Sequence, residues 1–238
     1  MPKAGDHVVV IGGTNGLGLD IAKAAHTLGA RVTVAGRDQD RAEKAASTIG
    51  QSASGQCCDL TSWDSLAALF AEIDVVDHLI LTALDRDNNT IADFRPDDAV
   101  RTLVMKNVGY AVAVQHALSK FSKNASVVMF SGLSMWLPMP GSTTISMANA
   151  GVVGLMNSLA LQIAPVRINT ITPGVVAGTD AVDNAAQVRG DRYEHLRQRT
   201  PGKRLPTPDD IVAATFALTD NLGINATNLV VDAGMRLA

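Results

Sequence analysis

The stretch VVVIGGTNGLG, Val8 to Gly18, decides the fold of this chain. Its apolar, β-branched start is typical of a short buried strand. Gly12, Gly16 and Gly18 then allow a tight turn, close approach of a diphosphate, and close packing of the helix that follows. The first turn of such a helix presents free amides and the positive end of its dipole, which suits an anion. We expect a strand, a glycine turn and a helix, although a purely structural turn would share this pattern.

Short apolar runs alternate with helical patterns along the rest of the chain, which indicates crossover units and a parallel sheet buried on both faces. We predict one domain over residues 1–238, an α/β fold with a doubly wound parallel sheet of about seven strands. Strands are expected at His7–Ile11, Arg31–Ala35, Gly55–Cys58, His78–Thr82, Ser126–Phe130, Arg167–Ile171 and Asn228–Val231. Helices are expected at Leu17–Leu28, Asp40–Ile49, Ser62–Glu72, Pro96–Lys120, Thr144–Ile163 and Pro208–Leu218.

One long irregular stretch, at about residues 174–206, follows the carboxyl end of a predicted strand. Loops of this length in compact domains are usually lids or binding loops, so we expect a substrate lid here.

Composition narrows the class of protein. The chain has 238 residues, 47% of them hydrophobic, and a net charge of −3. A net charge of −3 provides no positive electrostatic field that would attract nucleic acid and no polybasic segment that would anchor the chain to a membrane. A small-molecule substrate is therefore expected. The start MPKAGD runs directly into a strand without the apolar region of a signal peptide, which predicts a cytoplasmic location.

The end of the second predicted strand is where a dinucleotide site reads the adenosine ribose. Gly36 and Arg37 occupy this place, with no acidic residue. An acid would accept a hydrogen bond from a free 2′-hydroxyl, whereas arginine pairs with a 2′-phosphate. The sequence therefore favours NADP(H) over NAD(H), with a merely solvated arginine as the alternative.

Several segments, in this order and spacing, resemble the short-chain dehydrogenase/reductase family over nearly the whole chain. They are GGTNGLG from Gly12, CCDL from Cys57, MKNVG from Met105, AGVVGLMNSLALQIAP from Ala150, RINTITPG from Arg167 and VVDAG from Val230. The resemblance implies a Rossmann-type fold and a cofactor held by Gly12, Thr14, Asn15, Gly16, Leu17 and Gly18 in the turn, Asp59 and Leu60 at the adenine, Ala83 at the nicotinamide-side ribose, and Pro173, Gly174 and Val176 at the carboxamide. It also implies a homotetramer or homodimer packed through the two long helices.

The chain departs from the family where the chemistry is expected. Ordinary members use a Tyr, a Lys and a Ser supported by an Asn, but ISMANAGVVG places Ile145 at the Tyr position and Asn149 at the Lys position. Asn149 can hydrogen-bond a ribose hydroxyl, yet it cannot lower the pKa of a neighbour as an ammonium does. Gly132 aligns with the Ser, with Ser131 beside it and Ser134 two residues on. Asn107 matches the family clearly, so the catalytic candidates are Asn107, Ser131 and Ser134.

Other polar residues are weaker candidates. Asp85, Arg86 and Asp87 follow the fourth predicted strand, where one carboxylate could act as an acid or base, or the turn could simply be solvated. Tyr193 and His195 in the predicted lid could reach a substrate or only pack. The histidines show no metal-ligand spacing, and no metal is expected.

Three functions remain open. The first is an NADP(H)-dependent oxidoreductase with altered proton handling, since hydride transfer depends mainly on proximity and orientation, and an acceptor that is already cationic, such as an iminium, needs no acid. The second is non-redox chemistry, such as cyclisation, isomerisation or dehydration, with the bound dinucleotide as a scaffold. The third is a regulatory protein that binds NADP(H).

Overall fold

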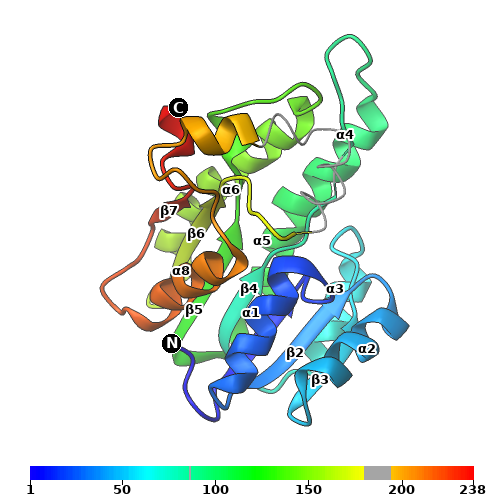
Figure 1. Ribbon diagram of the computed structural model, residues 1–238. Helices are drawn as coiled ribbons and strands as arrows, with labels where there is room; N and C mark the ends of the chain where they lie inside the picture. Colours follow the sequence, from blue (N-terminus) through cyan, green and yellow to red (C-terminus); the bar gives the residue numbers. More distant parts are fainter. Residues whose placement is uncertain (86, 180–193) are drawn as a thin grey trace.

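The computed structural model describes residues 1–85, 87–179 and 194–238, which form one doubly wound α/β domain (Figure 1). Seven parallel strands lie in the order β3-β2-β1-β4-β5-β6-β7. The strands are β1 His7–Ile11, β2 Arg31–Gly36, β3 Ala53–Cys57, β4 Val76–Leu81, β5 Phe121–Phe130, β6 Arg167–Pro173 and β7 Asn228–Val231. The predicted fold class is confirmed.

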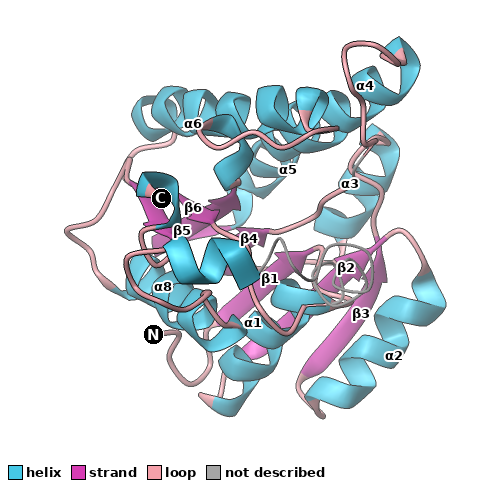
Figure 2. Cartoon of the chain, turned by 45° about the horizontal axis from the view of Figure 1, so that its top comes forward, coloured by secondary structure: helices cyan, strands magenta, loops and turns pink. Residues whose placement is uncertain are grey.

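Helices cover both faces of the sheet (Figure 2). The named helices are α1 Gly16–Thr27, α2 Gln39–Ile49, α3 Trp63–Ala71, α4 Pro96–Leu103, α5 Gly109–Ala117, α6 Thr143–Gln162 and α8 Pro208–Asp220. One layer contains α3, α5 and α6, and the other contains α1, α2 and α8.

The strand pattern explains the two layers. In β1, Val9 and Ile11 point into the core shared with α3, α5 and α6, whereas Val8 and Val10 point into the core shared with α1, α2 and α8. All of these side chains are at most 1% exposed. A strand buried on both faces needs an unbroken apolar run, because successive side chains alternate between the faces.

The long helix expected at Pro96–Lys120 is interrupted. After α4 the chain forms one π-helical segment, η1 Val104–Val108, then α5, and it ends in a 3₁₀ turn, η2 Leu118–Lys120. π-Helical turns shift the register of side chains and occur often at functional sites. Here the shift directs Met105 and Lys106 inward, where they are 7% and 2% exposed.

The predicted lid is described only in part. Residues 180–193, which include Tyr193, lie outside the described residues, as does Arg86. Residues 194–199 form a short helix. After it, Arg204 binds the carboxylate of Asp210 through two hydrogen bonds of 2.6 and 2.8 Å. Thr207 and Asp210 form a capping box that begins α8.

Strand order fixes where a ligand would bind. The chain runs outward through β2 and β3 on one side of β1, and through β4 to β7 on the other. In doubly wound sheets the connections diverge at this switch point, leaving a crevice at the carboxyl ends of the strands. The glycine turn follows β1 at this crevice.

Candidate active site

The glycine turn is tight because the chain after β4 crosses directly beside it. Gly12 has φ +94°, and a Cβ there would lie 2.5 Å from the backbone nitrogen of Ala83. The hydroxyl of Thr82 donates to the carbonyl oxygen of Gly12 at 3.0 Å. A Cβ at Gly18 would collide with the same carbonyl. Two of the three glycines are therefore required by packing within the turn.

Gly16 serves a different purpose. It has φ +51°, and a Cβ there would meet no atom within 4 Å. The space above it is open at the first turn of α1, and the side chain of Asn15 forms no capping hydrogen bond with the helix. The helix amides are thus left for another acceptor, which is the arrangement that a bound diphosphate needs.

At the adenosine end, Arg37 is exposed and already paired. Its Nη1 lies 3.0 Å from Oδ2 of Asp85, and Arg101 lies 3.6 Å from the same oxygen. Gly36 allows the side chain of Thr14 to pack against the end of β2, since a Cβ there would lie 2.7 Å from the Thr14 methyl carbon. Arg37 and Thr14 therefore border the same end of the crevice.

The other expected cofactor residues also follow strand ends. Asp59 and Leu60 come after β3, and one oxygen of Asp59 accepts from the amide and hydroxyl of Thr61, both at 2.8 Å. The carbonyl of Ala83, after β4, accepts from the Tyr110 hydroxyl at 2.9 Å.

Pro173 ends β6, and the amide of Gly174 donates to Val231 at 3.0 Å. Val176 is 5% exposed and packs in the core shared with α1. The three residues expected at the carboxamide thus lie at the carboxyl end of β6, across the crevice from the glycine turn.

The three catalytic candidates converge on α6. Nδ2 of Asn107, in η1, donates to the carbonyl of Ala148 at 2.9 Å. Ser131, at the end of β5, donates from its hydroxyl to the backbone carbonyl of Asn149 at 2.9 Å. The hydroxyl of Ser134 accepts from Nδ2 of Asn149, also at 2.9 Å. We call Asn107, Ser131, Ser134, Ile145 and Asn149 the reaction centre.

Asn149 is buried, yet its hydrogen bonding is incomplete. The side chain lies against Gly132, where a Cβ would come 2.5 Å from its Nδ2, so no side chain fits at this position in the present arrangement. Among the described residues, its Oδ1 is a buried side-chain atom without a hydrogen-bond partner. Buried polar atoms are nearly always paired, so this unpaired oxygen sets Asn149 apart from the other described side chains.

Neither α6 nor the nearby tyrosine can donate a proton as a phenol would. Ile145 is 8% exposed and apolar. Tyr110 lies in the described part of the chain, but burial raises the pKa of its phenol and its hydroxyl is committed to Ala83. Asp87 is engaged by Nδ2 of Asn89 at 2.7 Å. His195 is exposed on the short helix of residues 194–199.

Sequence reasoning missed Lys106. Its ammonium nitrogen lies 3.5 Å from the carbonyl oxygen of Ser131, inside the reaction centre. A lysine in a helical pattern is normally assigned to the solvent-facing side. The available signal was its position immediately before Asn107, the residue that matches the family most clearly.

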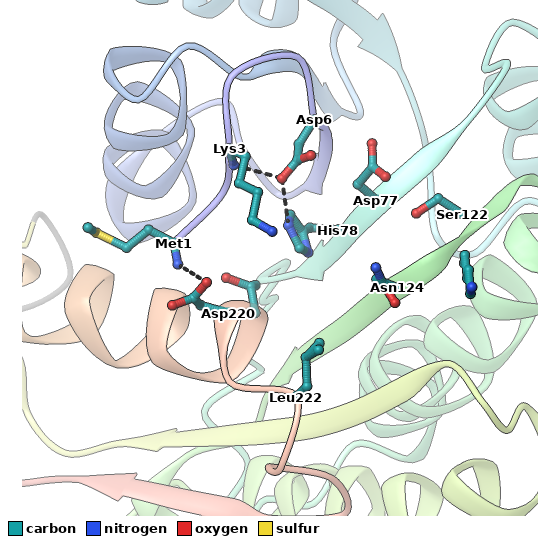
Figure 3. Close-up of a pocket in the computed structure, with 11 residues that line it drawn as sticks. Met1, Lys3, Asp6, Asp77, His78, Ser122, Asn124, Asp220 and Leu222 are labelled. Atoms are coloured by element: carbon teal, nitrogen blue, oxygen red, sulfur yellow. Dashed lines mark hydrogen bonds and ion pairs between the residues drawn. The ribbon is translucent and has the colours of Figure 1, made fainter.

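A separate cavity of about 340 Å³ lies at the opposite, amino edge of the sheet (Figure 3). His78 and Asp6 face each other there at 3.4 Å, and the amino group of Met1 lies 3.0 Å from Asp220. These two ion pairs engage four of its charged or titratable groups, and the cavity lies away from the glycine turn. We therefore place the functional site at the carboxyl edge.

The chain resembles known proteins over nearly its whole length. A family model described as "Enoyl-(Acyl carrier protein) reductase" matches residues 12–236. The chain is 26% identical to the short-chain dehydrogenase/reductase malC of Malbranchea aurantiaca, over 98% of this chain and 95% of that protein. It is 30% identical to an acetoacetyl-CoA reductase of Synechocystis, over 89% of this chain and 88% of that protein.

Solved structures share the fold. The MalC reductase/Diels-Alderase from Malbranchea aurantiaca superposes with a TM-score of 0.91 at 24% identity, covering 99% of this chain and 98% of that one. A small-chain dehydrogenase in complex with NADPH superposes with a TM-score of 0.81 at 24% identity, covering 98% of this chain and 100% of the other. The chain belongs to the short-chain dehydrogenase/reductase family.

Proposed function

We propose that this protein is an NADP(H)-dependent oxidoreductase acting on a small carbonyl or imine-like substrate. The observation that carries the proposal is the turn at Gly16, where open space meets the uncapped amides of α1. The preference for NADP(H) rests on Arg37, because a guanidinium pairs with a phosphate through two parallel hydrogen bonds.

The other cofactor contacts in this proposal are those that the family resemblance implies. Diphosphate oxygens would accept from the first-turn amides of α1, and Asp59 with Leu60 would border the adenine. Oδ1 of Asn149 would accept from a ribose hydroxyl beside Ala83, and Pro173, Gly174 and Val176 would line the carboxamide. When bound, the dinucleotide supplies or accepts a hydride.

At the reaction centre the residues have separate roles. Ser134 is half-buried, and its hydroxyl proton is free to orient a substrate oxygen, because its oxygen is the acceptor for Asn149. Ser131 is committed to the backbone of Asn149, and Asn107 ties η1 to α6. Ser131 and Asn107 therefore hold the site in shape, while Ser134 faces the substrate.

A second candidate is non-redox cyclisation on the same scaffold. MalC is named both a reductase and a Diels-Alderase, so one protein of this fold carries a cyclisation activity in its name. The apolar Ile145 at the reaction centre suits a substrate held by packing.

The experiment is a titration of NADPH and NADH into the protein, followed by absorbance of NADPH during incubation with ketones, enones and imines. Tight NADPH binding with consumption supports the oxidoreductase. Tight binding without consumption would favour the cyclase or a regulatory protein that binds NADP(H), and absence of binding would contradict all three.

A further inference from the structure

Lys106 is a charged side chain inside the reaction centre. Every lysine lies in the described part of the chain, and Lys106, 2% exposed, alone is buried. Placing an ammonium group in the interior is costly even when it is paired, so its presence beside a ligand site calls for a function.

The fold brings Lys106 there by two specific features. The π-helical segment η1 turns its side chain inward, and η1 is fixed to α6 by the hydrogen bond from Asn107 to Ala148. As a result Nζ of Lys106 lies 3.5 Å from the carbonyl oxygen of Ser131, whose hydroxyl binds the backbone of Asn149. Lys106 and Asn149 thus approach the same end of β5 from two different helices.

We propose that Lys106 supplies the proton and the positive charge that Ile145 and Asn149 cannot supply. This inference rests on the proposed oxidoreductase function. In the reduction of a carbonyl, Lys106 would give up one N–H proton while an O–H bond forms at the former carbonyl oxygen. The carbonyl π bond breaks, the hydride at carbon is the contribution of the reduced dinucleotide, and water returns the proton to the lysine amine.

The charge of Lys106 also selects the substrate class. A positive group beside the acceptor stabilises the negative oxygen that develops during reduction of a neutral carbonyl. The same charge repels a substrate that is already a cation. The protein is therefore a reductase of neutral carbonyl compounds, and preformed iminium ions are poor substrates for it.

The first test needs no turnover. Protein labelled with ¹⁵N-lysine is observed by NMR, and the Lys106 signal is identified by its loss in Lys106→Met. Saturating NADPH is expected to shift this signal and to leave that of the exposed Lys123 in place. If the protein binds NADPH and the Lys106 signal does not change, the inference about Lys106 is overturned but the proposed function is not. If the protein does not bind NADPH, the proposed function is overturned.

The second test compares two acceptors, ethyl acetoacetate as a neutral ketone and N-methyl-3,4-dihydroisoquinolinium as a preformed iminium. Lys106→Met should lower kcat for the ketone about 100-fold or more, the usual contribution of a general acid, while NADPH affinity changes little. Reduction of the iminium should be unchanged or faster. Lys106→Arg keeps the charge but donates a proton poorly, so it should fall between wild type and Lys106→Met. Lys123→Met is the matched control and should behave as wild type.

A purely structural lysine would give another pattern. If Lys106→Met loses reduction of the ketone and of the iminium together, and also binds NADPH more weakly, a role of Lys106 in proton transfer is contradicted. A wild-type enzyme that reduces the iminium but not the ketone contradicts it as well. Consumption of NADPH with neither acceptor, despite tight binding, counts against the oxidoreductase itself.

Discussion

In the proposed cofactor site, Arg37 would meet the 2′-phosphate while its side chain is paired with the carboxylate of Asp85. The 2′-phosphate would have to share Arg37 with Asp85, which lies 3.0 Å from it and also 3.6 Å from Arg101. Exposed ion pairs contribute only about 0–1 kcal/mol, so a phosphate with two charges would compete successfully. In this proposal, the preference for NADP(H) depends on a competition for Arg37 between the carboxylate of Asp85 and the 2′-phosphate.

Removal of Arg37 is the direct test of this preference. Arg37→Ala should raise the Kd of NADPH about 10- to 100-fold, because a charge-assisted hydrogen bond contributes roughly 1.5–3 kcal/mol. The Kd of NADH should stay nearly constant. Isothermal titration of both cofactors measures the difference, and an unchanged preference would contradict a role for Arg37.

Asp85→Asn tests the internal anion. Without the carboxylate, Arg37 and Arg101 lose their shared partner, and NADPH should bind up to about fivefold more tightly, in line with the small free energy of an exposed pair. Added salt should diminish the gain, since it screens exposed charges. Weaker NADPH binding in Asp85→Asn would show that Asp85 helps to hold Arg37 in its binding position.

Asn149 should act on the cofactor rather than on a proton. Asn149→Ala removes the unpaired Oδ1 and the donor to Ser134. We expect the Kd of NADPH to rise several-fold while kcat at saturating NADPH falls less. Asn157→Ala, at an exposed position of α6, is the matched control. A large fall of kcat with unchanged affinity would instead assign Asn149 to the chemical step.

At the scale of elements, the sequence predicted the helices and strands, but it did not predict the π-helical turn that interrupts one of the helices. β1 and β7 have the predicted bounds, because their apolar runs end at turn residues. β5 begins at Phe121, five residues before the predicted Ser126. This start was missed because the apolar run is interrupted by three polar residues, 122–124, that are not buried. The pattern of Pro96–Lys120 is helical throughout, so the π-helical turn depends on contacts such as that between Asn107 and Ala148. The burial of Lys106 depends on the same turn and was missed for the same reason.

Two strands carry buried histidines that make the stability depend on pH. His7 in β1 and His78 in β4 are 3% and 6% exposed, and burial is the main cause that lowers the pKa of each below the ordinary 6.5. The unfolded chain therefore binds more protons than the folded one once the pH falls below about 6.5. Their contribution to stability is complete above this pH and is lost as the pH falls below it.

His78→Gln should reduce this loss. Between about pH 7 and 5, the free energy of unfolding of the wild type should decrease by up to about 1.4 kcal/mol per pH unit for each buried histidine. The variant should show a shallower decrease, measured by urea unfolding. His195→Gln, at an exposed position, is the control and should keep the wild-type slope. A wild-type stability that stays constant across this range would contradict the argument.

At the scale of the whole molecule, α6 is longer and more apolar than its packing requires. It is long and apolar enough to cross a membrane by length and composition, and only 33% of that window is buried. Leu161 on α6 is 86% exposed, and Val100 on α4 is 57% exposed. Apolar side chains exposed on neighbouring helices are often covered by an interface with another chain. Because α4 and α6 contact each other, we propose that this layer packs against a second copy of the chain.

Light scattering at micromolar concentration tests this interface. The wild type should have at least twice the chain mass of 24.9 kDa. Val100→Arg and Leu161→Arg place charges in the expected contact and should shift the mass toward that of one chain, because an unpaired charge is costly to bury. Leu222→Arg changes an equally apolar side chain, 64% exposed, in the loop after α8, and should leave the mass unchanged. A wild-type mass near that of one chain would show that the apolar side chains of α4 and α6 remain in contact with solvent, and homo-oligomerisation through this layer would then be wrong.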